Sequence, residues 1–203
     1  MTTPVGAIPV PAGRWRRVAA YLVHRRVRIT LAVFVILMIE DVLIGIEPHD
    51  LLNFRDSESV IGWGLIVSGL ALRSWSAGIL RKTRELTTTG PYALIRNPLY
   101  VGSFMIMSGF CSLIDDEENI WIVLGPLASL YVLQILHEER VLSKLYGERW
   151  DDYARHVPRL FPRRWPRSAG DTWEFSQWTG SREYNALGAT LLGLVALQIW
   201  RLL

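Results

Sequence analysis

Five long apolar runs dominate this chain of 203 residues and restrict what it can fold into. They cover residues 29–46, 60–80, 100–114, 119–136 and 186–203. A helix needs about 20 apolar residues to cross the roughly 30 Å hydrocarbon core of a bilayer. The third run is shorter, so either Pro98 and Leu99 extend it or it lies where neighbouring helices thin the bilayer. Half of all residues are hydrophobic, which leaves too little polar surface for a soluble bundle. The sequence therefore predicts an all-α fold, an integral membrane helical bundle with about five transmembrane helices.

Basic residues gather in alternate connecting segments. The leader before the first run and the segments 81–99 and 137–182 are rich in arginine, whereas residues 115–119 hold no basic residue. The positive-inside rule then places the amino terminus and both basic segments in the cytoplasm. The net charge of +3 follows from this topology, so no nucleic-acid partner is predicted. The first run is too long for a signal peptide and no small-residue cleavage site follows it, so we expect a membrane helix there.

The residues that usually hold metals are few and scattered. Cys111 is the only cysteine, which excludes a disulfide within the chain and a thiolate zinc site. The four histidines fall in separate segments of the chain, and no H-E-x-x-H motif is present. No metal site is therefore predicted.

Charged residues inside apolar runs are costly and need a partner or a function. Glu40 and Asp41 lie late in the first run, where a snorkelling or helix-packing pair is the favoured interpretation. Arg73 lies deeper, within the second run. It either pairs with one of these carboxylates across two helices or lines a polar cavity, and the sequence leaves both alternatives open.

The polar segment between the second and third runs, residues 87–97, is predicted to fold back at the membrane surface. Gly90-Pro91 is typical of a turn. Asn97-Pro98 is typical of a helix start, with Asn97 as the N-cap and Pro98 at the first helical position. A helix start also suits a ligand carboxylate, although these features alone favour a structural turn.

A second polar segment, residues 137–162, follows the fourth run. Its apolar residues recur at helical spacing, which predicts an amphipathic helix, and Gly147 within it predicts a kink or a close backbone approach. Glu138 and Glu139 stand where the apolar run ends. They form either a solvated pair or, at a desolvated boundary, a site that binds a cation or acts as a base.

Together the two polar segments carry a recognisable pattern. Residues 90–102 read G-x-Y-x-x-x-R-[HN]-P-x-Y-x-G, and residues 138–159 read E-E-x-x-L-x-x-x-[FY]-G-x-x-[WY]-x-x-Y-x-x-x-V-P-R. This resembles the isoprenylcysteine carboxyl methyltransferase family, with phospholipid N-methyltransferases as relatives. The resemblance implies a single integral membrane methyltransferase domain over residues 1–203. Its catalytic core would span about 81–162, with an additional carboxy-terminal helix at 184–203.

The resemblance further implies S-adenosylmethionine as the cofactor, held in a cytoplasmic pocket. The cofactor-binding residues it implies are Arg84, Glu85, Leu86, Thr87, Tyr92, Asn97, Pro98, Leu99, Tyr100 and Glu138. Catalysis would fall to Glu138 or Glu139, as a base for an amine acceptor. Arg73 and Gln134 would contact the substrate. Asn97 stands where many relatives have histidine, and Gln134 stands where the eukaryotic carboxyl methyltransferases have an arginine that binds substrate.

The resulting expectation is a multi-pass membrane enzyme that methylates a lipophilic or lipid-linked substrate, with membrane lipids around it. An isoprenylcysteine carboxyl methyltransferase-like activity is the first interpretation, and phospholipid N-methylation of the phosphatidylethanolamine type is the alternative. An NADPH-dependent sterol-type reductase and a non-catalytic membrane binding protein are the other classes that the pattern leaves open.

Overall fold

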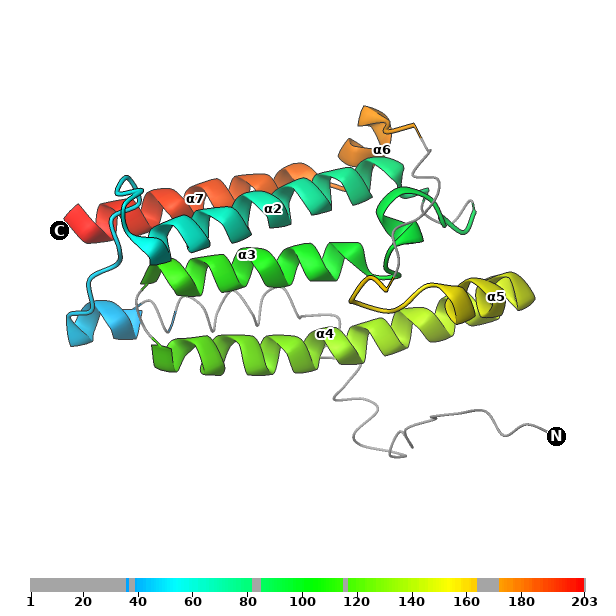
Figure 1. Ribbon diagram of the computed structural model, residues 1–203, viewed down its shortest axis with the longest axis horizontal. Coiled ribbons are helices and arrows are strands. Elements are labelled where there is room, and N and C mark those ends of the chain that lie inside the picture. The colour runs from blue at the N-terminus through cyan, green and yellow to red at the C-terminus, as the bar shows by residue number, and fades with distance from the viewer. Residues whose placement is uncertain (1–35, 37–38, 82–84, 115–116, 164–171, 203) are drawn as a thin grey trace.

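A computed structural model describes residues 36, 39–81, 85–114, 117–163 and 172–202. Within these residues the regular structure is helical throughout, so the predicted all-α fold is confirmed. The elements follow in the order α2 (Ser57–Ile79), η1 (Gly90–Ala93), α3 (Pro98–Ile114), α4 (Glu117–Tyr146), α5 (Glu148–His156), α6 (Phe175–Gly180) and α7 (Glu183–Leu202). The four long helices run along the same axis, and α5 and α6 lie at one end of the bundle (Figure 1).

The first two long helices begin at caps that the sequence supplies. Asp56 precedes α2, and its carboxylate accepts a hydrogen bond of 3.0 Å from the Ser59 N–H. α3 begins at Pro98, and the Asn97 carbonyl accepts from the amides of Tyr100 and Val101, each at 3.2 Å. The predicted helix start at Asn97-Pro98 is therefore confirmed. Pro98 and Leu99 extend the short third run, as the first of its two alternatives has it.

α2 and α3 pack against each other as an antiparallel pair, with glycines where the two backbones come closest. Gly62 lies beside Gly109, and Gly69 lies beside Gly102. A Cβ atom at Gly109 would come within 2.7 Å of the Gly62 carbonyl oxygen and of Ile66 Cγ1. Small residues at these positions let the two backbones approach closely, as they do in membrane bundles.

This packing predicts that Gly109→Ala separates α2 from α3. We expect it to lower the free energy of unfolding by about 1–3 kcal/mol, because the new methyl group meets backbone that cannot rotate away. Gly64→Ala is the matched control, since a Cβ atom there meets nothing within 4 Å. Thermal denaturation of the purified variants in detergent measures both. Equal midpoints for the two variants would contradict the packing.

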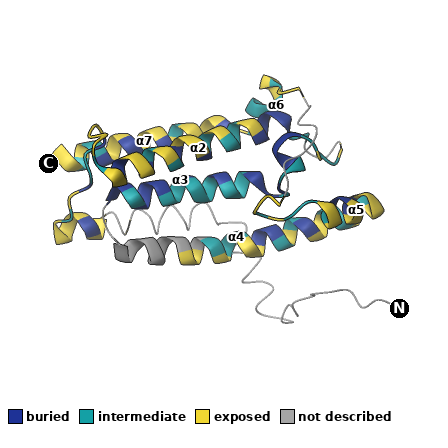
Figure 2. Ribbon diagram, viewed as in Figure 1, coloured by how far each residue is buried: buried dark blue, intermediate teal, exposed yellow. Residues whose placement is uncertain are grey.

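α7 completes the apolar core of the bundle. Leu194 and Leu197 of α7 pack in one buried cluster with Ile66 of α2 and with Phe110 and Leu113 of α3. The opposite faces of the long helices carry large exposed apolar side chains. Figure 2 colours the exposed residues yellow along the α2 and α7 ribbons. Leu191, Leu192 and Val195 of α7 are all exposed. Such an extended apolar surface is typical of a lipid-facing helix.

The prediction of about five transmembrane helices meets the structure only in part. Among the described residues, α2 and α7 are long and apolar enough to cross a membrane, and α3 is a shorter apolar helix. Only 28% of the apolar window of α2 and 17% of that of α7 are buried, unlike the core helix of a soluble protein. Most of the first predicted run, residues 29–46, lies outside the described residues.

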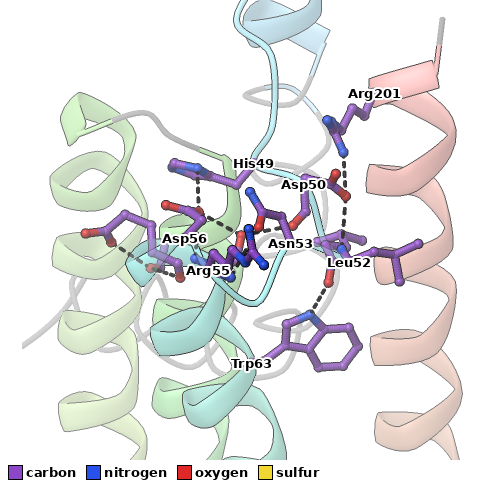
Figure 3. A network of polar contacts seen from close by, with 12 residues as sticks. His49, Asp50, Leu52, Asn53, Arg55, Asp56, Trp63 and Arg201 are labelled. Carbon is purple, nitrogen blue, oxygen red and sulfur yellow. Dashed lines mark hydrogen bonds and ion pairs between the residues drawn. The ribbon is translucent and has the colours of Figure 1, made fainter.

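A polar network ties the loop before α2 to the carboxyl end of α7 (Figure 3). Asp50 pairs with Arg201, and the Trp63 indole donates to the Leu51 carbonyl at 2.9 Å. His49 Nδ1 lies 2.9 Å from Asp56. These contacts fix the end of the bundle that lies opposite α5 and α6, away from the two sequence motifs (Figure 1).

At the other end, α4 breaks into α5 at Gly147. The residue has a φ of +52°, in the region that favours glycine, and it caps α5 after α4 ends at Tyr146. The predicted interruption at Gly147 is therefore confirmed as a break between two helices. The break turns the chain so that α5 reaches back to the segment 87–97.

Candidate active site

The two sequence motifs meet at one end of the bundle. The Arg96 N–H donates to the Pro158 carbonyl at 2.8 Å, and the Asn97 N–H donates to the Arg159 carbonyl at 3.2 Å. The Asn97 side-chain amide also donates to the Arg159 carbonyl, at 3.3 Å. The first motif and the end of the second are thus joined through their backbones, although some 60 residues separate them in sequence.

Two aromatic residues of α5, Trp150 and Tyr153, contact the segment 87–97. The Tyr153 hydroxyl donates to the Tyr92 carbonyl at 2.7 Å, and the Arg96 guanidinium lies 5.8 Å from the centre of the Trp150 ring. Tyr92, Trp150 and Tyr153 are all buried. Burial raises the pKa of the Tyr92 and Tyr153 phenols, so both hydroxyls stay protonated and remain hydrogen-bond donors.

We expect Tyr153→Phe to lower the free energy of unfolding by about 1 kcal/mol, because it removes the donor to the Tyr92 carbonyl and leaves the ring in place. Tyr184→Phe is a matched control on a half-exposed tyrosine. Thermal denaturation compares the two variants. A shift of the same size in both would show that the hydroxyl of Tyr153 does not hold the segment.

An ionic cluster fixes the same junction to the end of α4. Glu139 is buried, and its carboxylate lies 3.0 Å from Arg96 Nη1 and 2.9 Å from Arg159 Nη2. Hydrogen bonding to Glu139 raises the pKa of Arg159, whereas burial lowers the pKa of Arg96. Glu139 therefore binds two guanidinium groups, one from each motif.

Glu138, one residue earlier, has different surroundings. Its Oε1 accepts a hydrogen bond of 2.7 Å from the Tyr100 hydroxyl and one of 2.6 Å from the Gln134 amide. Tyr100 belongs to the first turn of α3, and its ring packs edge-on against Tyr131 of α4 at 5.2 Å. Glu138 is thus held between the start of α3 and the end of α4 by neutral donors.

A cavity of about 810 Å³ opens between these elements, within the roughly 300–1,000 Å³ typical of small-molecule sites. Most of the residues that the resemblance implied line it. These are Arg73, Glu85, Leu86, Thr87, Tyr92, Asn97, Pro98, Leu99, Tyr100, Gln134 and Glu138. Arg84 lies outside the described residues. Glu139 is adjacent to the cavity, but it is not among the described residues that line it.

Three residues of the cavity wall carry a buried polar side-chain atom that makes no hydrogen bond within the described part of the chain. They are the Tyr92 hydroxyl, Arg96 Nε and Gln134 Oε1. Buried polar atoms are nearly always paired in folded proteins. Two hydrogen-bond donors and one acceptor at one cavity are what a polar ligand would satisfy.

Arg73 also lines the cavity, and its carboxylate partner is neither Glu40 nor Asp41. Its guanidinium binds Glu183, the first residue of α7, with Nε 2.6 Å from Oε1 and Nη2 2.9 Å from Oε2. Of the two alternatives for Arg73, the cavity is therefore confirmed and the pairing with the first run is wrong. Sequence reasoning missed Glu183, although its position at the start of an apolar run was an available signal.

The described residues contain no group of three or more His, Cys, Asp or Glu side chains arranged to hold a metal ion.

Comparisons with known proteins agree with the motifs. Residues 58–149 match the family model described as phospholipid methyltransferase. The nickel-cobalt-cadmium resistance protein NccN of Alcaligenes xylosoxydans xylosoxydans is 39% identical over 93 residues, which cover 45% of this chain and 43% of that protein. The cobalt-zinc-cadmium resistance protein CzcN of Cupriavidus metallidurans is 29% identical over 167 residues, which cover 80% of this chain and 76% of that protein.

A third relative is the protein-S-isoprenylcysteine O-methyltransferase of Schizosaccharomyces pombe, which is 26% identical over 98 residues. The match covers 48% of this chain and 42% of that protein. No solved structure matches the chain. The family model spans α2, the segment 87–97, α3, α4 and the first residues of α5, the elements that build most of the cavity. Residues 58–149 are therefore similar to the phospholipid methyltransferase family, and about half of the chain is similar to an isoprenylcysteine O-methyltransferase.

Proposed function

We propose that this protein is an S-adenosylmethionine-dependent methyltransferase that acts on a lipophilic acceptor in the membrane. The observation that carries the proposal is the cavity itself. Both motifs of the methyltransferase family line it, and three of its residues hold buried polar atoms without a partner. A small polar ligand fits such a wall, and the family narrows that ligand to a methyl donor.

The residues of the cavity suit the parts of S-adenosylmethionine. Its carboxylate matches the start of α3, around Pro98 and Leu99, where the helix dipole is positive. Its cationic groups match the Glu138 carboxylate, and its adenine matches an aromatic face such as that of Tyr92. We also propose that the strip from Arg84 to Thr87 contacts the cofactor through its backbone groups. When bound, the cofactor supplies the methyl group for a direct displacement.

In such a reaction the residues of the protein position the cofactor and the acceptor, remove a proton and exclude water. Positioning alone contributes on the order of 7–11 kcal/mol in favourable model reactions. For an amine acceptor, we assign Glu138 as the base, because its carboxylate lines the cavity. Glu139 was the other candidate base. Two guanidinium groups engage it, so we assign it the positioning of the segment 87–97.

The relatives leave the acceptor open. The matching family model names phospholipids and one relative is an isoprenylcysteine O-methyltransferase, while the names of the two resistance proteins state no reaction. Two observations favour a lipophilic acceptor. The long helices expose apolar faces beside the cavity, and the cavity wall includes apolar residues of α3 and α4 such as Leu99, Val141 and Leu142. We propose a multi-pass topology with the amino terminus and the cavity on the cytoplasmic side.

A transfer assay tests this function directly. The purified protein is incubated with S-adenosylmethionine labelled in its methyl group and with a total lipid extract, and the label is followed into the organic phase. We expect labelled lipid that increases with time and protein, and none with heat-denatured protein. The absence of labelled lipid from a protein that binds the cofactor would mean that the acceptor is not lipophilic.

A further inference from the structure

The Arg73–Glu183 pair forms part of the cavity wall. Arg73 comes from the last third of α2, and Glu183 is the first residue of α7. The two side chains are only 19% and 7% exposed, and they make a bidentate contact. Such parallel hydrogen bonds between guanidinium and carboxylate are strong and fix the geometry of both groups. The pair is therefore a fixed part of the cavity wall.

The third nitrogen of the Arg73 guanidinium is engaged as well. Nη1 donates to the Leu99 carbonyl at 3.3 Å and also to the Ser103 hydroxyl. Gly102 leaves the space in which the stem of Arg73 lies, because a Cβ atom there would come within 2.6 Å of Arg73 Cγ. Every nitrogen of this guanidinium thus binds a group of the protein. Four of its five N–H donors are engaged, so a ligand can make a bidentate contact with this cation only by displacing Glu183 or the groups at the start of α3.

Two other arginines that line the cavity in the described part of the chain also lie beside a carboxylate of the protein, each through a single contact. Arg81 pairs with Glu85, and Arg96 pairs with Glu139 at 3.0 Å. A carboxylate that approaches Arg73 would lose its water and would have to compete with Glu183 for the guanidinium. Burial of a charge without a partner is strongly unfavourable.

We propose that Glu183 is a specificity-determining residue: by neutralising Arg73 it makes the cavity select an acceptor whose reacting head group carries no negative charge, and reject a carboxylate. This inference rests on the proposed function for its meaning, since it names the class of acceptor that the methyltransferase takes. It deepens that function by separating uncharged or cationic amphiphiles from fatty or prenylated carboxylates. The sequence motifs do not include Glu183, which lies beyond residue 159.

Binding of matched amphiphiles tests the proposal without any methyl transfer. Octanoate and octan-1-ol share a tail and differ in charge, and isothermal titration calorimetry in one detergent buffer compares them. We expect the native protein to bind the alcohol on the order of tenfold more tightly. In Glu183→Gln the guanidinium of Arg73 loses its carboxylate, so octanoate should gain on the order of tenfold in affinity. The affinity for octan-1-ol should change less than twofold.

Three further variants make the test specific. Glu148→Gln removes one negative charge from an exposed residue of α5 and should leave the octanoate affinity unchanged. Arg73→Gln combined with Glu183→Gln should abolish the gain, because the unmasked cation is gone. Arg73→Gln alone leaves the Glu183 carboxylate unmatched and should strengthen octylammonium binding on the order of tenfold. This mirror variant also keeps the proposal testable if Glu183→Gln does not fold.

Octanoate that binds the native protein as tightly as octan-1-ol would overturn the proposal. So would an unchanged octanoate affinity in Glu183→Gln, or an unchanged octylammonium affinity in Arg73→Gln. S-adenosylmethionine binding is measured on the same samples. If the cofactor fails to bind and the octanoate gain appears, the proposed function fails and the neutralised cavity stands. If the cofactor binds but Glu183→Gln does not gain affinity for octanoate, only the role of Glu183 is overturned.

Discussion

Replacing Glu139 by glutamine is expected to lower the free energy of unfolding by about 2–4 kcal/mol. The buried carboxylate binds Arg96 and Arg159 at 3.0 and 2.9 Å, so its loss leaves two guanidinium groups with a neutral amide between them. Breaking a buried ion pair by removing one partner typically costs about 3–5 kcal/mol. The Arg159 side chain is 53% exposed, and solvent screening of its charge places the expected loss below the top of that range.

The same substitution should also disturb the site, because Arg96 anchors the segment 87–97. Thermal denaturation in detergent measures the stability of the variant. Its affinity for S-adenosylmethionine reports whether the segment 87–97 keeps its structure. Asp152→Asn is the matched control. Asp152 forms an exposed pair with Arg155 at 3.4 Å, and such surface pairs contribute at most about 1 kcal/mol. A destabilisation by Glu139→Gln no larger than that of the control would show that Glu139 does not fix the two motifs together.

Replacing Glu138 by glutamine should leave the stability of the protein almost unchanged but weaken its binding of S-adenosylmethionine. The amide oxygen still accepts from Tyr100 and Gln134, so we expect the thermal midpoint to stay close to that of the native protein. The negative charge that faces a cationic ligand is lost. Hydrogen bonds to charged groups contribute about 1.5–3 kcal/mol, so affinity for S-adenosylmethionine should fall between about tenfold and a hundredfold.

Titration calorimetry of Glu138→Gln and of Glu148→Gln separates a specific effect from a general change in charge. Glu148 is exposed in the first turn of α5 and should tolerate the change. An unchanged cofactor affinity in Glu138→Gln, with the fold intact, would remove Glu138 from the cofactor site. The two adjacent glutamates would then both be structural.

Much of the helical framework could be predicted from local sequence. The apolar run 60–80 became α2 over Ser57–Ile79, and Asn97-Pro98 set the start of α3. Gly147 marked the break between α4 and α5 because only a residue without a side chain readily adopts its positive φ. These signals are local: a cap, a proline and a glycine act within one turn of the position where they stand.

The pairing of charged residues could not be predicted in the same way. The partner of Arg73 lies 110 residues away, and sequence reasoning considered only Glu40 and Asp41 as its carboxylate partners. The choice depends on which helices lie side by side, and Figure 1 shows α7 beside α2. For the same reason the adjacent Glu138 and Glu139 look equivalent in sequence. In the structure one lines the cavity and the other binds two arginines.

We expect above all that the cavity at the junction of the two motifs binds S-adenosylmethionine. Isothermal titration calorimetry of the purified protein with S-adenosylmethionine, and separately with NADPH, tests it most directly. We predict saturable binding of S-adenosylmethionine that weakens in Glu138→Gln, and no binding of NADPH. Binding of NADPH would indicate a reductase, and binding of neither cofactor would indicate a non-catalytic membrane protein; either result contradicts the claim.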